Sequence, residues 1–349
     1  MKVAATIPRL MFLTATTVWL FAAAERGMGV PPMDGTPMPR ATASAPARPK
    51  LWLQRRLVDF GPVRPGSTTR ASVTVRNDGA AELVVTQAET GCECLAARLE
   101  PMRLATGQSG VLSIELRTAG RRGWIREAVG LVGNQSEGVT PVAVVARVEE
   151  DVYLRPERLY VLAKPGGRVT ATAQVVSRAG EMALGEASLE VKGLTAKVDS
   201  SAAPDRPARV ELTGAAPLVT GVIRQPLRLP ARRGGLLVLP LILSVTRADV
   251  TPRSVDFGRF PQGQAVTREL TVSLPEGAKL AEVRASPAYV RAELEAAEGK
   301  AVIRLWPMKQ APLGPFSGEL TIGIAGQEAS RIVLPFEGYV DSPEGRPER

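Results

Sequence analysis

The sequence contains no histidine and only two cysteines, Cys92 and Cys94. Without histidine, the chain cannot form a His-based catalytic triad or offer the commonest nitrogen ligand for zinc or copper. It also lacks a Gly-x-Ser-x-Gly nucleophile elbow, a phosphate-binding glycine loop and an Asp-rich calcium loop. We therefore expect a protein that is not an enzyme and that carries no cofactor.

Aromatic residues are scarce, at 4% of 349 residues. The hydrophobic core must therefore consist mainly of Val, Leu, Ile and Ala. Few aromatics also leave little for nucleic acid bases to stack on, although the net charge is +9 and Arg outweighs Lys. Because the basic residues are spread along the chain in short blocks, we expect solvated loops and no nucleic acid partner.

A long apolar run occurs only near the start of the chain, from Leu10 to Ala23, after the basic residues Lys2 and Arg9. The run is shorter than the ~20 residues that a membrane-spanning helix needs. Small residues before Glu25 suit a cleavage site, so residues 1–24 are predicted to be a signal peptide cleaved near Ala24. The alternative is that this apolar run is retained as a membrane anchor. The mature protein is expected in the periplasm or secreted, with at most peripheral membrane association.

Residues 25–50 are rich in Pro, Ala and small polar residues and contain almost nothing to bury. This composition is typical of an extended, flexible linker. The last residues, 342–349, have the same character and are predicted to be a disordered tail.

The remaining chain contains an internal repeat. The tetrapeptide Val-Asp-Phe-Gly occurs at residues 58–61 and again at residues 255–258, a displacement of 255 − 58 = 197 positions. A fainter middle copy places Tyr160 where Phe60 stands, at a displacement of 160 − 60 = 100. Repetition at this spacing indicates three related modules. The predicted domains are residues 51–150, 151–247 and 248–341.

The modules have the pattern of β-strands. Apolar and polar residues alternate from Ala71 to Arg76, which predicts a sheet with one buried face, and Asn77-Asp78-Gly79 predicts a turn. Gly61 is expected to break the first strand, and residues 290–298 are expected to form a hairpin with Ala301–Trp306. No convincing helical pattern intervenes, so the predicted fold is all-β with three tandem β-sandwiches. A barrel would give similar turn spacing, but the module length of ~100 residues favours the sandwich.

The module ends repeat as well. Gly123, Gly221 and Gly314 each open a run whose ninth residue is apolar, namely Leu131, Leu229 and Ile322. A proline then stands just before or inside the last strand of each module, at positions 141, 240 and 335. Proline cannot donate to a β-ladder, so these residues are expected at an edge position or at the start of a strand.

Cys92 and Cys94 are separated by one residue, in Gly91-Cys92-Glu93-Cys94. On a straight strand their Cα atoms would lie roughly 6.6 Å apart, at the far edge of the disulfide range, so a bridge between them requires a turn, which Gly91 would permit. Three interpretations stay open: buried or bridged structural cysteines, a soft-metal or redox pair, and an intermolecular bridge. As a metal site, Cys92 and Cys94 would suit Cu(I), because soft sulfur selects soft metals.

The stretch from Val58 to Cys94 resembles the bacterial domain-of-unknown-function family 1573. Val-Asp-Phe-Gly is followed by a Pro-Gly, a strand, Asn77-Asp78-Gly79 and then Cys92-Glu93-Cys94, where the family pattern has Asn-x-Gly and Cys-Gly-Cys. The family is similar to the immunoglobulin-like Hydin, or ASH, domains. The resemblance covers the first module and only the opening motif of the third, and it implies an immunoglobulin-like sandwich with a non-catalytic role in protein interaction.

These observations favour an exported, non-enzymatic scaffold or adaptor that binds another envelope or extracellular protein. The alternative is a thiol-dependent Cu(I)-binding or redox protein that uses Cys92 and Cys94. Binding of anionic glycans by the Arg-rich surface is a third possibility.

Overall fold

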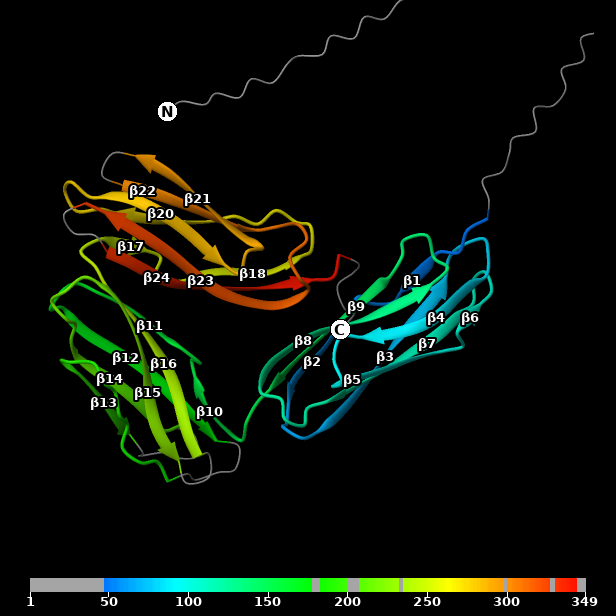
Figure 1. Cartoon of the computed structure of the whole chain (residues 1–349), viewed down its shortest axis with the longest axis horizontal. Helices are drawn as coiled ribbons and strands as arrows, with labels where there is room; N and C mark the ends of the chain where they lie inside the picture. The colour runs from blue at the N-terminus through cyan, green and yellow to red at the C-terminus, as the bar shows by residue number, and fades with distance from the viewer. Residues whose placement is uncertain are drawn as a thin grey trace, which may run out of the picture. The chain divides into compact units, whose positions relative to one another are not determined.

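The computed structural model describes residues 47–177, 183–199, 207–231, 235–297, 300–326 and 330–343. All the secondary-structure elements in these ranges are β-strands (Figure 1). The expected signal peptide, most of the expected linker and residues 344–349 of the expected tail lie outside the described residues. The part of the chain that is described has no helix long and apolar enough to cross a membrane.

The first sandwich packs a sheet of order β1-β3-β7-β5 against a sheet of order β2-β9-β8-β4-β6. Its strands are β1 (Leu51–Leu53), β2 (Leu57–Val63), β3 (Thr68–Asn77), β4 (Leu83–Thr90), β5 (Leu95–Glu100), β6 (Arg103–Leu104), β7 (Ser109–Arg117), β8 (Gly123–Gly133) and β9 (Thr140–Val148).

The second sandwich combines the sheets β10-β12-β14-β13 and β11-β16-β15. Its strands are β10 (Val152–Arg155), β11 (Leu159–Ala163), β12 (Arg168–Ser177), β13 (Leu194–Asp199), β14 (Arg209–Ala215), β15 (Gly221–Ala231) and β16 (Gly235–Val245).

The third sandwich combines the sheets β17-β19-β22-β21 and β18-β24-β23-β20. Its strands are β17 (Asp249–Thr251), β18 (Val255–Pro261), β19 (Arg268–Ser273), β20 (Lys279–Ser286), β21 (Val290–Ala297), β22 (Lys300–Pro307), β23 (Gly314–Ala325) and β24 (Ser330–Asp341). The pairing of β21 with β22 confirms the hairpin expected there; residues 298 and 299 lie outside the described residues.

The same pairing closes each sandwich. The strand that carries the repeated motif lies parallel to the last long strand of its module, in the pairs β2–β9, β11–β16 and β18–β24. Facing sheets with buried alternate residues, such as Val73 and Val75 at 0% exposure, define an immunoglobulin-like sandwich and confirm the all-β fold.

The Val-Asp-Phe-Gly motif forms a β-bulge. Gly61 has a φ of +61°, a conformation that favours glycine, and its N–H donates to Oδ1 of Asp59 at 2.7 Å. The ladder to β9 shifts register at this point. The expectation that Gly61 breaks the strand is therefore wrong: the strand continues to Val63, because a bulge bends it without ending it.

The third sandwich repeats this device. Asp256 accepts the N–H of Gly258 at 2.7 Å, and the ladder shifts between Asp256 and Arg259. The middle sandwich has neither the aspartate nor the glycine, and its ladder from Leu159 to Ala163 is regular. The middle copy of the motif therefore differs in sequence where it also differs in structure, since the bulge is absent from that ladder.

Pro141, Pro240 and Pro335 lie inside β9, β16 and β24, and each of these strands has neighbours on both sides. In each strand, however, the parallel ladder begins only after the proline, at Ala143 in β9, Leu241 in β16 and Phe336 in β24. Pro141 is the second residue of β9, which agrees with the expected place at the start of a strand. The alternative expectation of an edge position is wrong at the level of the whole strand. It holds locally, because the side of each proline toward the parallel partner is not yet paired.

Buried polar groups join the second and third sandwiches. Ser244 in β16 is 0% exposed, and its Oγ accepts the N–H of Val333 at 2.9 Å. The hydroxyls of Thr246 and Ser330 lie 3.2 Å apart, also buried. Because an unpaired buried hydroxyl is costly, these hydrogen bonds make the contact between the two sandwiches specific.

Asn77 organises the turn that follows β3. Its side chain is 0% exposed, and its amide donates to the carbonyl oxygens of Ala81 at 2.7 Å and Leu104 at 2.9 Å. Its Oδ1 accepts the N–H of Gly79 at 3.0 Å. The predicted turn is confirmed, and its first residue also reaches β6 across the sandwich.

We expect Asn77→Ala to destabilise the first sandwich by about 2–4 kcal/mol, because a buried carbonyl left without a donor costs ~1–3 kcal/mol and the turn loses a further hydrogen bond. Asn77→Asp should be at least as damaging, because it removes both donors and buries a charge. Urea unfolding followed by tryptophan fluorescence, to which Trp52 and Trp124 of the first sandwich contribute, measures both effects. The neighbouring exposed change Asp78→Asn is the control, and equal stability of Asn77→Ala and wild type would contradict the role given to Asn77.

Candidate functional site

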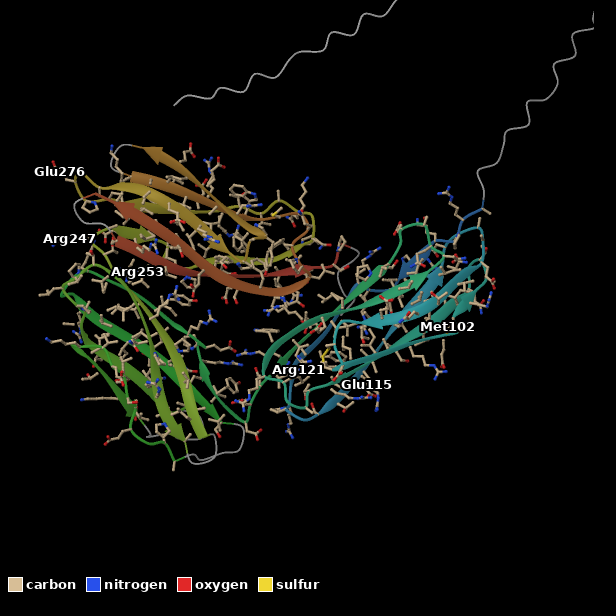
Figure 2. The ribbon with its side chains drawn as sticks, in the orientation of Figure 1. Met102, Glu115, Arg121, Arg247, Arg253 and Glu276 are labelled. Atoms are coloured by element: carbon tan, nitrogen blue, oxygen red, sulfur yellow. A yellow bond between two sulfur atoms is a disulfide. The ribbon has the colours of Figure 1, made fainter. Side chains whose placement is uncertain are left out.

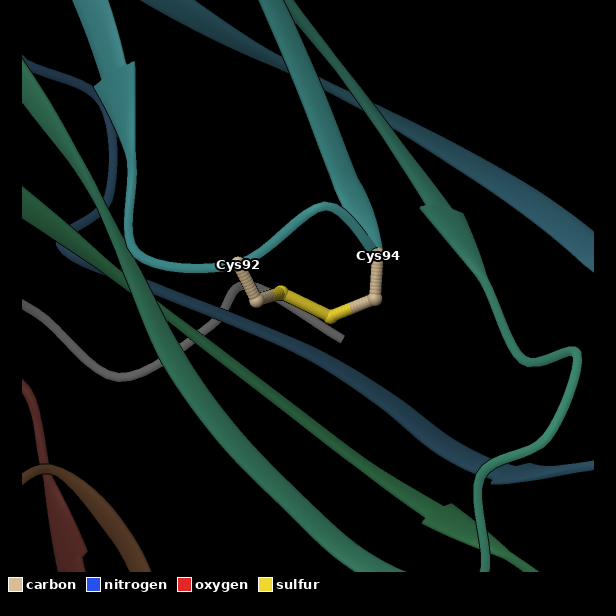
Figure 3. Close-up of a disulfide and its surroundings, with 2 residues drawn as sticks. All are labelled: Cys92 and Cys94. Atoms are coloured by element: carbon tan, nitrogen blue, oxygen red, sulfur yellow. A yellow bond between two sulfur atoms is a disulfide. The ribbon is translucent and has the colours of Figure 1, made fainter.

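Cys92 and Cys94 form a disulfide with a Cα–Cα distance of 5.2 Å (Figure 3). Cys92 lies in the loop that leaves β4 and Cys94 immediately precedes β5, so the bond spans the turn by which the chain passes from one sheet to the other. The N–H of Leu95 donates to the carbonyl oxygen of Cys92 at 3.2 Å. This turn replaces the straight strand and brings the two Cα atoms within the range of a disulfide.

Of the three interpretations of the cysteines, the structure agrees with the first, because it contains a bridge between Cys92 and Cys94 within the chain. An intermolecular bridge does not agree with it, because both cysteines of the chain are already paired. The expectation of Cys92 and Cys94 as a metal site is not decided by the bridge. It would apply only to the reduced protein, since a thiolate, and not a disulfide sulfur, is the metal ligand.

A third group with ligand chemistry lies beside the disulfide. The two Sγ atoms and a carboxylate oxygen of Glu127, in β8, all lie within 4.8 Å of one another. Glu127 follows Cys94 by 127 − 94 = 33 residues, and no spacing pattern pointed to it. The ladder between β4 and β8 ends at Thr90 opposite Val129, so two residues further on Cys92 comes opposite Glu127.

The surroundings of the site are partly open. Cys94 is 6% exposed, whereas Cys92 and Glu127 are half-buried. Gly91 leaves room for the carboxylate, since a Cβ at that position would lie 3.0 Å from Oε2 of Glu127. A reagent can therefore approach Cys92 while Cys94 remains anchored in the core of the first sandwich.

Several charged side chains elsewhere in the described residues form ion pairs with one another. Glu115, labelled in Figure 2, accepts hydrogen bonds from Arg70 and Arg117, each at 2.9 Å. The hydrogen bond from Arg70 contributes most, and together the two bonds hold the pKa of Glu115 below its ordinary value. Such pairing leaves the net charge unchanged and agrees with the expectation of solvated charged faces.

Glu319, in β23, is the centre of a cluster that also includes Arg224 and Tyr160 from the second sandwich. Its carboxylate accepts from Nη2 of Arg224 at 2.8 Å and from the hydroxyl of Tyr160 at 3.1 Å. The hydrogen bond from Arg224 is the main cause that lowers the pKa of Glu319. The carboxylate is thus charged near neutral pH and serves as an acceptor that links the two sandwiches.

The fold and the disulfide together define the class of protein: a chain of tandem immunoglobulin-like sandwiches whose first sandwich carries a Cys-x-Cys bridge. Residues 51–148, which form the first sandwich, match the family model described as "Protein of unknown function (DUF1573)". The family predicted from Val58 to Cys94 is confirmed. No curated protein matches the chain.

Several solved structures are similar to parts of the chain. A protein of unknown function from Porphyromonas gingivalis W83 has 14% identity and a TM-score of 0.26, over 56% of this chain and 99% of that chain. The ASH/PapD-like domain 7 of human CEP192 has 14% identity and a TM-score of 0.23, over 34% and 99%. The I-band fragment I67-I69 of titin has 9% identity and a TM-score of 0.21, over 84% and 99%.

We expect the Cys92–Cys94 bond to contribute little to folding. Closing a loop of three residues removes little entropy from the unfolded chain, so the chain-entropy relation gives about 1–2 kcal/mol. Denaturant unfolding of the oxidised protein and of the double variant Cys92→Ser/Cys94→Ser should differ by that amount in the first sandwich. A loss of the folded state in the double variant would show instead that the bond is a structural requirement.

Proposed function

We propose that the chain is an exported, non-enzymatic scaffold or adaptor that binds an extended segment of another envelope or extracellular protein along the open edge of β15. The single observation that carries this proposal is the incomplete pairing of that edge. The three-sandwich architecture and the family match of the first sandwich are compatible with it. Export follows from the signal-peptide pattern of residues 1–24.

In the first and third sandwiches the strand equivalent to β15 has a ladder partner along its C-terminal half, at residues 129–133 of β8 and 319–325 of β23. β8 pairs with β4, and β23 pairs with β20. In the second sandwich the outer edge of β15 makes only two isolated bridges among the described residues, Leu184 to Ala231 and Ser188 to Arg228. The N-terminal half of β15 therefore presents an edge of the kind to which another strand can add.

The register identifies which backbone groups are free. Arg228 exchanges hydrogen bonds with Ser188, so its N–H and C=O face away from β16. Residues four and six positions before it have the same orientation in an antiparallel strand, which places the N–H and C=O of Arg224 and Val222 on the open edge. Pro226 adds a carbonyl oxygen but no donor. The edge thus offers pairing to a segment of about five residues.

A groove of about 670 Å³ runs beside this edge. Val222 and Arg224 line one side, and Glu282 and Thr321 of the third sandwich line the other. Its walls hold both apolar and charged groups, which suits an extended peptide with alternating side chains. Backbone pairing would provide affinity, and the groove would select side chains.

We expect Val222→Pro to weaken partner binding roughly tenfold, because it removes one N–H from the open edge, each hydrogen bond contributing ~0.5–1.5 kcal/mol, and places a ring against the incoming strand. Val222→Ala keeps the N–H and is the matched control. The partner is first captured by a photo-crosslinking residue at position 222 and then purified for titration.

Crosslinking from position 238, on β16 away from the edge, controls for nonspecific capture. Equal affinity of Val222→Pro and Val222→Ala for the purified partner would exclude strand addition at β15. Failure to capture any specific partner from envelope extracts would count against the scaffold itself.

A second candidate is a thiol-dependent function of Cys92 and Cys94, such as metal binding or redox exchange. One observation favours it: the bond closes only three residues, next to a half-buried carboxylate that the sandwich does not need for its core. A bridge with so little to contribute to stability is free to open and close without unfolding the domain.

A further inference from the structure

We infer that, when the disulfide is reduced, Cys92, Cys94 and Glu127 form a binding site for a divalent zinc-type cation, which the disulfide closes again on oxidation. This inference rests on the second candidate function, since it requires free thiols. It adds Glu127 as the third ligand and names the class of metal.

The three donors are already gathered. Both sulfur atoms and a carboxylate oxygen lie within 4.8 Å of one another. In a tetrahedral zinc site with Zn–S bonds of about 2.3 Å, two sulfurs lie roughly 3.8 Å apart. Reduction removes the bond that holds the sulfurs closer than this distance, so that rotation of the three side chains can bring their donors to ligand positions.

The elements that supply the donors hold them in place. Cys94 is anchored by burial and by its carbonyl oxygen, which accepts the N–H of Arg117 at 2.8 Å. Glu127 lies within the ladder between β8 and β9, opposite Val144. A site on such strands is pre-organised, whereas Cys92, in the loop, supplies the freedom to open and close the bridge.

The donor set favours zinc over copper. Cu(I) selects soft sulfur ligands, and the third group here is a hard carboxylate oxygen. Zinc accepts thiolate and carboxylate together, and three protein ligands leave a fourth position for water. The expectation of a Cu(I) site from the two cysteines alone therefore changes once Glu127 is included.

The chemistry of opening is a two-electron reduction. A dithiol transfers two hydrogen atoms to the bridge, giving two thiols and its own disulfide. A phosphine does the same with one water, whose oxygen it retains as the phosphine oxide. Because free thiols have a pKa of about 8.5 and bind metal as thiolates, zinc binding then releases protons and strengthens as the pH rises.

The test uses the full chain, reduced with a water-soluble phosphine and freed of metal, and titrated with Zn²⁺ against a chromophoric chelator. Co²⁺ is the spectroscopic probe, since its bonds to thiolate give a charge-transfer absorption that a carboxylate alone does not. Alkylation and intact mass confirm beforehand that both thiols are free. We expect one equivalent of Zn²⁺ on the reduced protein, none on the oxidised protein, and an affinity that rises with pH.

Glu127→Gln should weaken Zn²⁺ binding tenfold or more while the Co²⁺–thiolate band persists at saturating metal. Glu93→Gln is the matched control, because it makes the same charge change at an exposed position between the two cysteines, and it should bind within about twofold of wild type, as a well-screened exposed charge does. Circular dichroism of both variants verifies the fold.

Reduced wild type that binds no Zn²⁺, or equal affinity of Glu127→Gln and Glu93→Gln, would overturn the zinc site. A bridge that the phosphine cannot open in the folded protein would overturn the thiol-dependent function as well. The mass measurement thus separates a failure of the metal site from a failure of the function on which it rests.

Discussion

The parallel pairing between the motif strand and the last long strand of each module is the constraint on which the architecture depends. It joins segments about 80 residues apart in sequence, and parallel strands cannot be joined by a short hairpin. The intervening chain must therefore travel through both sheets before it returns. Because the two strands run in the same direction, the last residue of β9, Val148, lies opposite Val63 at the end of β2 and away from the start of the motif strand. The next module follows from there after a short connection, between Val148 and Val152.

Most of this could be predicted from the sequence, because the relevant signals are local. Alternation of apolar and polar residues predicts strands, glycine and proline predict turns, and repetition predicts modules. The bulge could not be distinguished from a strand end, since Gly61 supports either, and what decides is the partner strand β9, far away in sequence. The pairing around the prolines could not be predicted for the same reason, because the unpaired side of Pro141 depends on where β2 begins to pair.

The residues of the site also differ in whether a local sequence signal predicts them. Cys92 and Cys94 stand out in a chain with no other cysteine, but whether they bond depends on the turn between β4 and β5. Glu127 carries no signal of its own, and it meets the cysteines because of the register between β4 and β8. That ladder contains a shift between Val85 and Gln87, and without it a different residue of β8 would face Cys92. A property of backbone pairing thus determines which side chain joins the site.

The prolines of β9, β16 and β24 have one more effect. Each lies one or two residues ahead of the first parallel pair. If the motif strand slid back along its partner, a carbonyl oxygen would meet a proline nitrogen that has no hydrogen to donate. Each proline therefore acts as a stop that limits misalignment in one direction. The three modules carry similar motif strands, which could also pair with the wrong partner during folding. Because a proline stands at the same place in every module, a slip in this direction is penalised in the same way whichever partner the motif strand meets.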